Sequence, residues 1–451
     1  MASSAYQAEL EAICPEGWKV VPLTDAVIFQ EGPGILAKDF QSSGVPLIRL
    51  KGVEGDFVSL EGCNFLAPEK VASKWSHFRL ERGDLVISTS ASFGRVSEVT
   101  EESAGAVPYT GLIRFQPKTK EIDAGFLRAF LGSSAFMQQV EAMASGSVIR
   151  HFGPMHLKQM ALPLPPLGEQ RAIGNMAKLF AERLRNQSQT NESLEAMART
   201  LFKAWFVDFE PVRAKMEGRW QRGQSLPGLP GHLYDVFPDR LVESEFGEIP
   251  EGWEMRSLDS IANYLNGLAL QKFPPESETE FLPVIKIAQL RAGNTNGADK
   301  ASTQIKPEYV VVDGDVLFSW SGSLEVEVWN GGRGALNQHL FKVTSNEVPK
   351  WFYFFATRQH LSDFRAIAAG KATTMGHIQR KHLTDARIAV APPESMKKFD
   401  AVIASQFDQL VSNAQQSRSL AQLRDTLLPK LISGELRISD AERFLGEVDR
   451  A

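Results

Sequence analysis

The sequence predicts a mixed α/β (α+β) protein with two similar domains in a pseudo-twofold arrangement, separated by two long antiparallel helices that form a coiled coil. Three observations predict this fold. The second half of the chain repeats the order of motifs found in the first half. Each half then ends on a heptad-like run long enough for a helix of about 40 residues. Finally, a chain of 451 residues exceeds what one hydrophobic core usually organises.

The internal repeat is visible in matched segments. Pro15–Trp18 recurs as Pro250–Trp253, ahead of a segment typical of a first strand. Arg82–Ser88 recurs as Asp313–Ser319, and both copies place a Gly-Asp pair before an apolar run. This pattern indicates a tight turn followed by a half-buried strand. Because the offset between the copies drifts by only a few residues, we expect loops to differ while the order of elements is kept.

Each repeat ends on a predicted long helix. The first helix starts after Pro165 and Pro166, since proline is tolerated in a first helical turn. Its seam positions, spaced alternately by four and three residues, are Ile173, Ala177, Phe180, Leu184, Gln187, Asn191, Leu194, Ala198, Leu201 and Trp205. The second seam is Phe399, Ile403, Phe407, Leu410, Ala414, Ser417, Ala421, Leu427 and Leu428. Both seams become polar midway, so polar residues could fix the register of an antiparallel pair. The alternative is two helices buried in unrelated cores.

Composition excludes several classes of protein. The chain is 43% hydrophobic and 23% charged, which is typical of a folded globular protein and excludes a mostly disordered one. A net charge of -5 argues against a protein that binds polyanions nonspecifically. A protein that recognises a particular nucleic-acid sequence needs only local positive surface. Two cysteines, Cys14 and Cys63, cannot form a disulfide framework or a four-cysteine zinc site. With no basic, apolar leader and no long apolar run, we expect a cytoplasmic protein without a membrane segment.

The sequence lacks the familiar motifs of catalysis. It contains no phosphate-binding loop ending in Gly-Lys-Ser/Thr, no His-Glu-x-x-His pair and no Gly-x-Ser-x-Gly elbow. It also lacks the Asn-Pro-Pro-Phe or Asp-Pro-Pro-Tyr element with which amino-methyltransferases hold a target base. We therefore predict no catalytic residue, no metal site and no cofactor in this chain.

Four stretches together resemble the specificity subunits of type I restriction-modification enzymes, and the resemblance covers nearly the whole chain. They are Leu162–Gln170, Leu201–Val212, Gly370–Ile378 and Leu423–Gly434. One departure is clear. The second strand-to-helix junction, Ala391–Met396, lacks the pair found at Glu169 and Gln170, so we expect the contacts of that pair to be asymmetric.

The resemblance implies a domain organisation. Residues 1–165 and 251–393 would be target-recognition domains, 166–210 and 394–434 spacer helices, 211–250 a linker, and 435–451 a C-terminal tail. The linker would let the second domain reverse its direction.

The resemblance also implies a function. The chain would be a noncatalytic subunit that reads a bipartite, asymmetric site in double-stranded DNA. It would dock two methyltransferase subunits and, through them, the restriction subunits. S-adenosylmethionine, ATP and Mg²⁺ would then belong to the partner subunits. The alternatives are a DNA methyltransferase or nuclease with its own divergent active site, and a homodimeric structural protein.

Basic residues in two equivalent segments are the first candidates for DNA contact. Residues 145–159 and 370–383 are basic and contain no acidic residue. Lysine and arginine can neutralise phosphates, and arginine or histidine can donate to guanine edges. The alternative is a solvated loop or helix start. The full set of candidates is Arg49, Lys51, Arg95, Arg150, His151, Lys158, Lys286, Arg291, Arg333, Lys371, His377, Arg380 and Lys381.

Other conspicuous residues favour a structural interpretation. His156 and His382, each followed by leucine, are expected to be structural. Asn330–Gly334 could cradle a phosphate, but the tip of a hairpin explains it better. The aromatic run Trp351–Phe355 could stack on bases, yet a helix packed in the core is favoured because Phe126, Leu127 and Phe130 occupy the corresponding region.

Overall fold

The computed structural model describes residues 10–12, 14–89, 95–143, 152–370, 376–438 and 440–441. The chain divides into two compact units. Unit 1 comprises residues 1–185 and 420–451, and unit 2 comprises residues 186–419. No helix in the described ranges is both long enough and apolar enough to cross a membrane.

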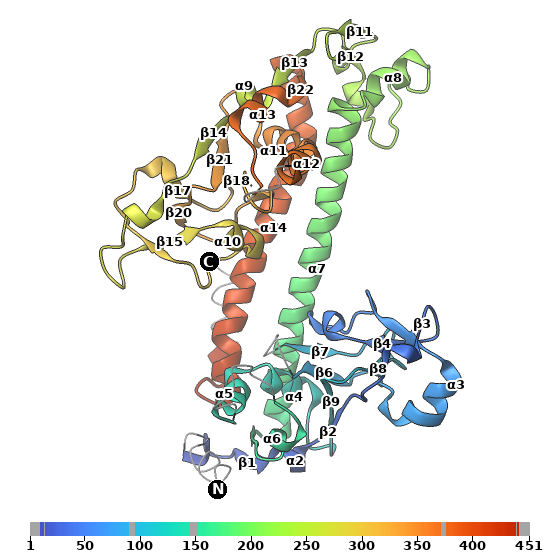
Figure 1. The fold of residues 1–451 in the computed structure, drawn as a ribbon, viewed down its shortest axis with the longest axis vertical. Helices are drawn as coiled ribbons and strands as arrows, with labels where there is room; N and C mark the ends of the chain where they lie inside the picture. The colour runs from blue at the N-terminus through green and yellow to red at the C-terminus, as the bar shows by residue number, and fades with distance from the viewer. Residues whose placement is uncertain are drawn as a thin grey trace. The chain divides into compact units, whose positions relative to one another are not determined.

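Unit 1 contains three small sheets (Figure 1). The first pairs β1 (Lys19–Pro22) with β10 (Ala161–Leu164). The second has the order β2 (Val27–Glu31), β9 (Leu112–Pro117), β6 (Leu85–Ser88), β7 (Val96–Glu98). The third has the order β3 (Phe40–Gln41), β5 (Asn64–Leu66), β4 (Val45–Ile48), β8 (Val107–Pro108), and only its β4–β8 pair is parallel among the strand pairs of the described residues of unit 1. The helices beside them are α2 (Leu23–Ala26), α3 (Pro68–Lys70), α4 (Ala124–Leu131), α5 (Ser134–Met143) and α6 (Pro154–Leu157).

Unit 2 repeats this arrangement. Strand β13 (Glu254–Ser257) pairs with β22 (Arg387–Val390). The second sheet has the equivalent order β14 (Asn263–Asn266), β21 (Leu340–Thr344), β18 (Val316–Ser319), β19 (Val326–Val328). The third has the order β16 (Lys300–Ala301), β15 (Leu282–Ile285), β20 (Gly334–Leu336), β17 (Val310–Val311), with β15–β20 parallel. The helices are α9 (Leu258–Ile261), α10 (Ile287–Ala292), α11 (Lys350–Gln359), α12 (Leu361–Ala369) and α13 (Arg380–Asp385). The predicted duplication and mixed α/β class are confirmed.

The Gly-Asp turns form as predicted. Gly83 and Gly314 have φ of +87° and +86°, a region that favours glycine. Asp84 accepts the backbone N–H of Glu81 at 2.7 Å, and Asp315 accepts that of Val312 at 2.9 Å. The strands that follow were expected to be half-buried, and this expectation is wrong. All four residues of β6 and of β18 are buried, because the two faces of each strand pack into different hydrophobic clusters.

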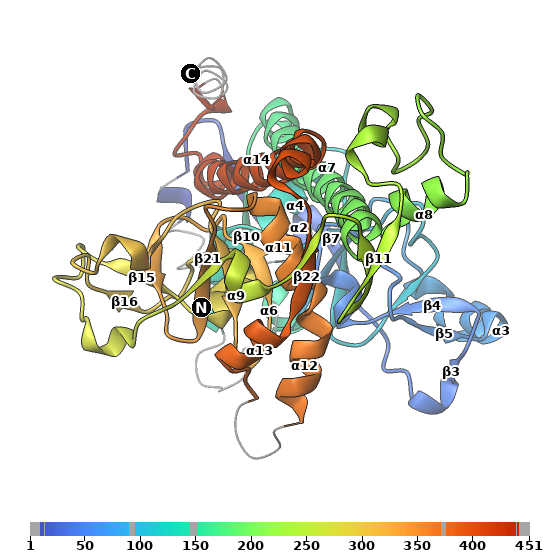
Figure 2. The same cartoon turned by 90° about the horizontal axis from the view of Figure 1, so that it is seen from above.

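The two predicted long helices are α7 (Leu167–Phe206) and α14 (Pro393–Ser433), which lie side by side in Figures 1 and 2. In unit 2 their polar midsections meet. Gln187 accepts the hydroxyl of Ser417 at 2.9 Å, and the Asn191 side chain donates to the backbone carbonyl of Leu410 at 3.2 Å. Residue numbers rise along one helix as they fall along the other, so the pair is antiparallel. The polar seam positions therefore contact one another, as predicted.

The expected linker is a folded part of unit 2. Residues 211–250 form most of α8 (Glu210–Met216) and the hairpin of β11 (Leu241–Ser244) with β12 (Gly247–Pro250). Trp220, Leu233 and Phe237 from this segment are buried in the core of unit 2. The linker prediction failed because the glycines and prolines of the segment alternate with large apolar side chains, which supply enough burial to fix it.

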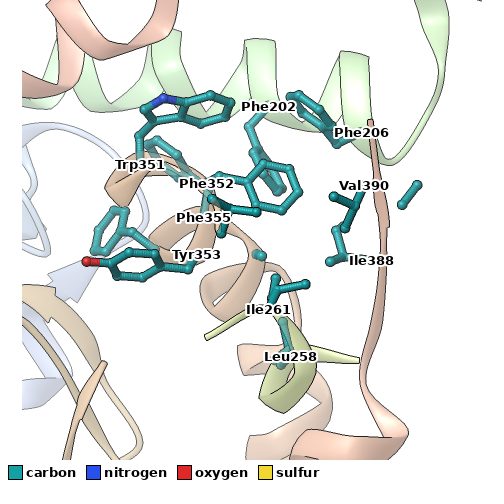
Figure 3. Packing of buried hydrophobic residues seen from close by; sticks show 14 of the residues in the cluster. Phe202, Phe206, Leu258, Ile261, Trp351, Phe352, Tyr353, Phe355, Ile388 and Val390 are labelled. Atoms are coloured by element: carbon teal, nitrogen blue, oxygen red, sulfur yellow. The ribbon is translucent and has the colours of Figure 1, made fainter. Parts of the chain in front are cut away.

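The aromatic run is a core helix, as favoured. Trp351 and Phe352 of α11 pack against Phe206 at the end of α7, with ring centroids 5.8 and 5.0 Å apart (Figure 3). In unit 1, Phe126 and Phe130 of α4 are equally buried. In each unit, an apolar helix thus attaches the sheets to the long helices.

Candidate nucleic-acid interface

A group of polar and aromatic side chains gathers at one edge of the second sheet of unit 2. Trp320 follows directly on β18, Asn266 ends β14, and Gln338 lies just before β21. These three strands are neighbours, and their antiparallel order brings those ends to one edge. The Trp320 indole N–H donates to the Asn266 side-chain oxygen at 2.9 Å and to the backbone carbonyl of Gln338 at 3.2 Å.

Two histidines complete this group. The Trp320 ring lies 5.8 Å from the His339 ring and 6.2 Å from the His377 ring, between centroids. Ser321 and His339 share a hydrogen bond of 3.0 Å. We call Asn266, Trp320, Ser321, Gln338, His339 and His377 the Trp320 cluster. The ring of Trp320 and both histidine rings are half-buried, so each retains an accessible part.

Helix α13 brings the predicted residue Arg380 beside the Trp320 cluster. Arg380 donates to the backbone carbonyl of Tyr264 at 3.0 Å, and its guanidinium lies 5.6 Å from the centre of the Phe341 ring. The Phe341 ring is in turn 6.0 Å from that of Trp320. Arg380 and Lys381 are exposed, and neither forms an ion pair with a carboxylate in the described part of the chain. Two predicted residues, His377 and Arg380, are therefore brought together, and Lys381 follows Arg380 in α13.

The histidines expected to be structural are confirmed as such. His382 accepts the backbone N–H of Gln379 at 3.0 Å through Nδ1, which closes the first turn of α13. His156 does the same for Gly153 at 3.1 Å at the start of α6. The same capping contact occurs in both copies, because a side-chain acceptor satisfies a backbone donor that a helix start leaves without a partner.

Other predicted residues of unit 2 are engaged elsewhere. Lys286 is ion-paired with Asp299, and Arg291 lies 4.0 Å from a carboxylate oxygen of Glu325. Arg333 is exposed in the loop between β19 and β20. None of these three residues forms a hydrogen bond or ion pair with the Trp320 cluster among the described residues.

The glycine-rich loop 330–334 is neither a hairpin tip nor a phosphate cradle. The hairpin expectation is wrong because β19 and β20, which the loop connects, belong to different sheets. The backbone N–H of Gly332 donates to the Asp313 carboxylate at 2.6 Å, and the Trp329 indole donates to the Gly332 carbonyl at 2.6 Å. Gly332 has φ of +92°, and a side chain there would collide with Arg418. The positive φ favours glycine here, whereas the end of the flexible Arg418 side chain could move aside.

The candidates in unit 1 are more dispersed. Arg49 donates to the Asn64 side chain at 3.3 Å and lies 5.6 Å from the centre of the Tyr109 ring. Lys51 pairs with Glu61 at 2.8 Å, with both side chains largely exposed. Arg95 donates to the backbone carbonyl of Glu54 at 2.8 Å.

The remaining candidates give little local geometry. Lys158 is exposed and has no ion pair within the described ranges. Arg150, His151 and Lys371 lie outside the described residues.

The edge equivalent to the Trp320 cluster has different chemistry in unit 1. Thr89, which follows β6, stands where Trp320 stands and donates to the backbone carbonyl of Gly111 at 3.1 Å. Glu31 and Gly111 of unit 1 are equivalent to Asn266 and His339 of unit 2, as the matching strand registers show. The two units therefore share a scaffold and differ at the strand ends.

The pair at Glu169 and Gln170 has internal contacts. Gln170 is buried, accepts the Asp123 backbone N–H at 2.9 Å, and donates to the carbonyls of Glu121 at 3.0 Å and Pro165 at 2.9 Å. Glu169 accepts from the Trp18 indole at 3.1 Å and pairs with Arg437 at 3.2 Å.

In the second copy, Met396 is buried at the position equivalent to Gln170. The expected asymmetry is confirmed, and it concerns the fold of unit 1.

Sequence reasoning missed most of the Trp320 cluster. Asn266 and Trp320 are 54 residues apart, and only strand pairing brings them together. The available signal was the placement of Trp320 in a Ser/Gly-rich turn directly after a buried strand. Among the described residues, no group of three or more His, Cys, Asp or Glu side chains is placed to hold a metal ion.

Comparison with known proteins places this geometry in context. Residues 15–196 and 250–423 match the family model described as the type I restriction modification DNA specificity domain. The type I restriction enzyme MjaIX specificity subunit of Methanocaldococcus jannaschii is 22% identical over 437 residues, covering 94% of this chain and 95% of that subunit. The EcoKI specificity subunit of Escherichia coli is 23% identical over 457 residues, covering 94% of this chain and 90% of that protein. The crystal structure of the type I restriction-modification S subunit from M. genitalium superposes with a TM-score of 0.53 at 15% identity, covering 92% of this chain and 96% of the other.

Proposed function

Because this chain belongs to the family of type I restriction modification DNA specificity domains, we propose that its two domains read the two halves of a bipartite, asymmetric DNA site. The chain is the noncatalytic, sequence-recognising component of such a system. We assign the target-recognition domains to residues 1–165 and 251–393, the spacer helices to 166–210 and 394–434, and the tail to 435–451.

The observation that carries the proposal is the contrast between the two strand-end edges. A duplicated scaffold would read a symmetric site if both copies presented the same groups. Here the positions of Asn266, Trp320 and His339 in unit 2 are occupied in unit 1 by Glu31, Thr89 and Gly111. Different donors and acceptors recognise different base edges in the major groove, so the two half-sites differ in sequence.

The Trp320 cluster has suitable groups for base reading. Asparagine and glutamine amides can bond adenine in a bidentate manner, and histidine can donate to guanine. Arg380 and Lys381 beside the cluster are exposed cations that can contact the phosphates and set the register on the duplex. Lys158, Arg49 and Arg95, with Arg150 and His151, are the corresponding candidates in unit 1. Lys51, Lys286 and Arg291 are weaker ones because carboxylates lie close to them.

We further propose that α7 and α14 dock two methyltransferase subunits, through which the restriction subunits join. Leu179 and Met197 of α7 are 54% and 55% exposed, and large apolar side chains exposed on a helix are typical of partner contacts. S-adenosylmethionine, ATP and Mg²⁺ would be bound by those partners. A cytoplasmic location follows from the same proposal, since the DNA and the partner subunits are there.

Mapping of methylated adenines tests the proposal. The chain is coexpressed with its methyltransferase subunit in a host lacking other adenine methylation, and modified adenines are mapped across the genome. We expect a single bipartite motif with two different half-sites separated by a fixed number of unspecified bases. A continuous motif, or methylation independent of this chain, would contradict the assignment.

A further inference from the structure

Unit 1 contains a cavity of about 490 Å³ where its domain meets the helix pair. Much of its apolar lining comes from α4, from α7 and from α14, and the side chains that α4 and α7 contribute to it are alanines. Ala129 of α4, Ala177 and Ala181 of α7, and Leu428 of α14 all line it. The cavity is partly open to solvent, so a group from another molecule can enter it.

The same place in unit 2 is filled by aromatic rings. The repeat aligns α7 with α14, and the start of α4 with that of α11. The equivalent pairs are Ala129 and Phe355, Ala181 and Phe407, and Leu428 and Phe202. In unit 2 the Phe355 ring lies 5.7 Å from Phe202 and 6.1 Å from Phe407, and Figure 3 shows Phe202 and Phe355 facing each other. The cavity in unit 1 is therefore the space that three phenylalanine rings occupy in unit 2.

The charges on the cavity wall favour an uncharged ring over an anion. Arg128, which stands where unit 2 has Phe354, is paired with Asp56 at 3.0 Å and lies 5.5 Å from the centre of the Phe57 ring. Arg424 is paired with Asp425 at 2.8 Å. Arg95 and Glu54 also line the cavity, so three guanidinium groups are balanced by three carboxylates, and a phosphate would meet little unbalanced charge. A guanidinium plane can still stack on an aromatic ring.

We propose that this cavity is a docking pocket for an aromatic side chain of one methyltransferase subunit. The second unit fills the equivalent space with its own rings and needs no such side chain. This inference rests on the proposed function, in which the helix pair docks partner subunits. The turns of α7 that line the cavity also carry the exposed Leu179, so apolar surface for a partner is present on more than one side of this helix.

A side chain is a better occupant than a free small molecule. Sites for small ligands fix orientation with a few well-placed polar groups, whereas this lining includes alanine and leucine side chains, and two of its three arginines are paired with carboxylates. A side chain needs no such groups, since its own backbone orients it. The two docking sites of the chain would therefore be unlike, and one partner would bind through an anchor that the other lacks.

Two substitutions at one position test this inference on the full-length chain coexpressed with the methyltransferase subunit. Ala181→Phe copies Phe407 and fills the pocket, while Ala181→Ser leaves it open. We expect A181F to keep or raise the melting temperature, because it fills a cavity, and to weaken one of the two partner sites at least tenfold. Native mass spectrometry would then show complexes with one methyltransferase subunit per chain. A181S should retain two, as the wild type does.

A second variant keeps the test possible if A181F does not fold, and indole tests whether the cavity binds a ring. If A181F does not fold, Ala177→Ile, which copies Ile403, takes its place. We expect A177I to show the same loss of one partner site. Normal binding of both partners by a folded, pocket-filled variant overturns the inference and leaves the proposed function intact. If the wild type itself binds no methyltransferase subunit, both are overturned. Indole, added to the wild type and to A181F, tests ring binding directly: we expect stabilisation of the wild type alone, and equal responses would also count against the pocket.

Discussion

At the scale of single residues, the two copies of the fold act as controls for each other. His156 and His382 make the same capping bond in both, which identifies a structural role that neither position reveals alone. Thr89 and Trp320 occupy equivalent positions with different chemistry, and we propose that this position varies for function. Arginine and lysine residues cannot be sorted in this way from sequence, because their contacts depend on which carboxylates the fold brings near.

Trp320 is expected to determine recognition of one half-site. Trp320→Ala removes the donor to Asn266 and the ring beside His339, so the cluster loses its common support. We expect specific DNA binding by the assembled complex to fall about tenfold or more, because tenfold corresponds to about 1.4 kcal/mol and one good base contact contributes about 1–3 kcal/mol. Trp320→Phe should lose less, since it retains a ring. Fluorescence anisotropy at fixed salt, on DNAs altered in one half-site at a time, measures this; equal effects on both half-sites would show that the residue supports folding instead.

The basic residues of segment 370–383 should contribute to affinity. Replacing Lys371, Arg380 and Lys381 by alanine is expected to weaken DNA binding by the complex and to lower its dependence on salt, because each phosphate contact adds to that dependence. The melting temperature should change little, since Arg380 and Lys381 are exposed. Binding isotherms at several salt concentrations check this prediction. Unchanged binding, or loss of cooperative unfolding, would assign these side chains another role.

Gln170 should matter for the stability of unit 1. Gln170→Met copies the residue found in the second copy, but leaves the Asp123 N–H and two carbonyls without partners. A buried polar group without a hydrogen-bond partner costs about 1–3 kcal/mol, so we expect a lower free energy of unfolding in urea. Gln189→Met, at an exposed position of the same helix, is the control and should stay within about 0.5 kcal/mol of the wild type. Similar effects of the two substitutions would contradict this account.

At the scale of elements, the two long helices are the most distinctive part of the chain. α7 continues without interruption from unit 1 into unit 2, and α14 returns in the opposite direction. Their seam is apolar where each unit has its core and polar where Gln187, Asn191 and Ser417 meet. Amides and hydroxyls pair only in certain alignments, so this midsection specifies the register that the apolar contacts alone would leave less defined.

Lengthening the helices should change the spacing of the DNA site. Inserting four residues after Gln187, with a matching insertion beside Ser417 in α14, adds about one turn, or about 6 Å of rise. B-DNA rises about 3.4 Å per base pair. We expect the preferred half-sites to be unchanged in sequence and to lie one or two base pairs further apart, as mapped by adenine methylation. An active variant with altered half-sites and unaltered spacing would exclude a ruler role for the helices.

At the scale of the whole molecule, the chain consists of a duplicated scaffold whose copies have diverged where they would meet ligands and partners. The sheets keep their order, while the strand ends, the cavity of unit 1 and the added segment 211–250 differ. This distribution suits a protein that presents two different reading surfaces and leaves chemistry to other subunits.

The noncatalytic assignment is testable on the purified chain. Supplied with DNA, S-adenosylmethionine, ATP and Mg²⁺, the chain alone should neither methylate nor cleave the DNA, because it is the noncatalytic component of the system. Adding the methyltransferase subunit should restore adenine methylation. Radiolabelled methyl transfer and gel analysis of the DNA follow the two reactions, and activity of the chain by itself would support the competing enzyme hypothesis.

The sequence by itself determined the duplication, the mixed α/β class, the two long helices and their polar midsections, because these depend on periodicity and on repeats that local spacing reveals. It also identified the structural histidines, through their recurrence. Only the tertiary structure decided that residues 211–250 are folded, that β6 and β18 are buried on both faces, and that loop 330–334 connects two sheets. It alone assembled the Trp320 cluster and the cavity beside Ala181. The physical reason is that burial, ion pairing and the meeting of strand ends depend on contacts between residues far apart in the chain, which no local pattern encodes.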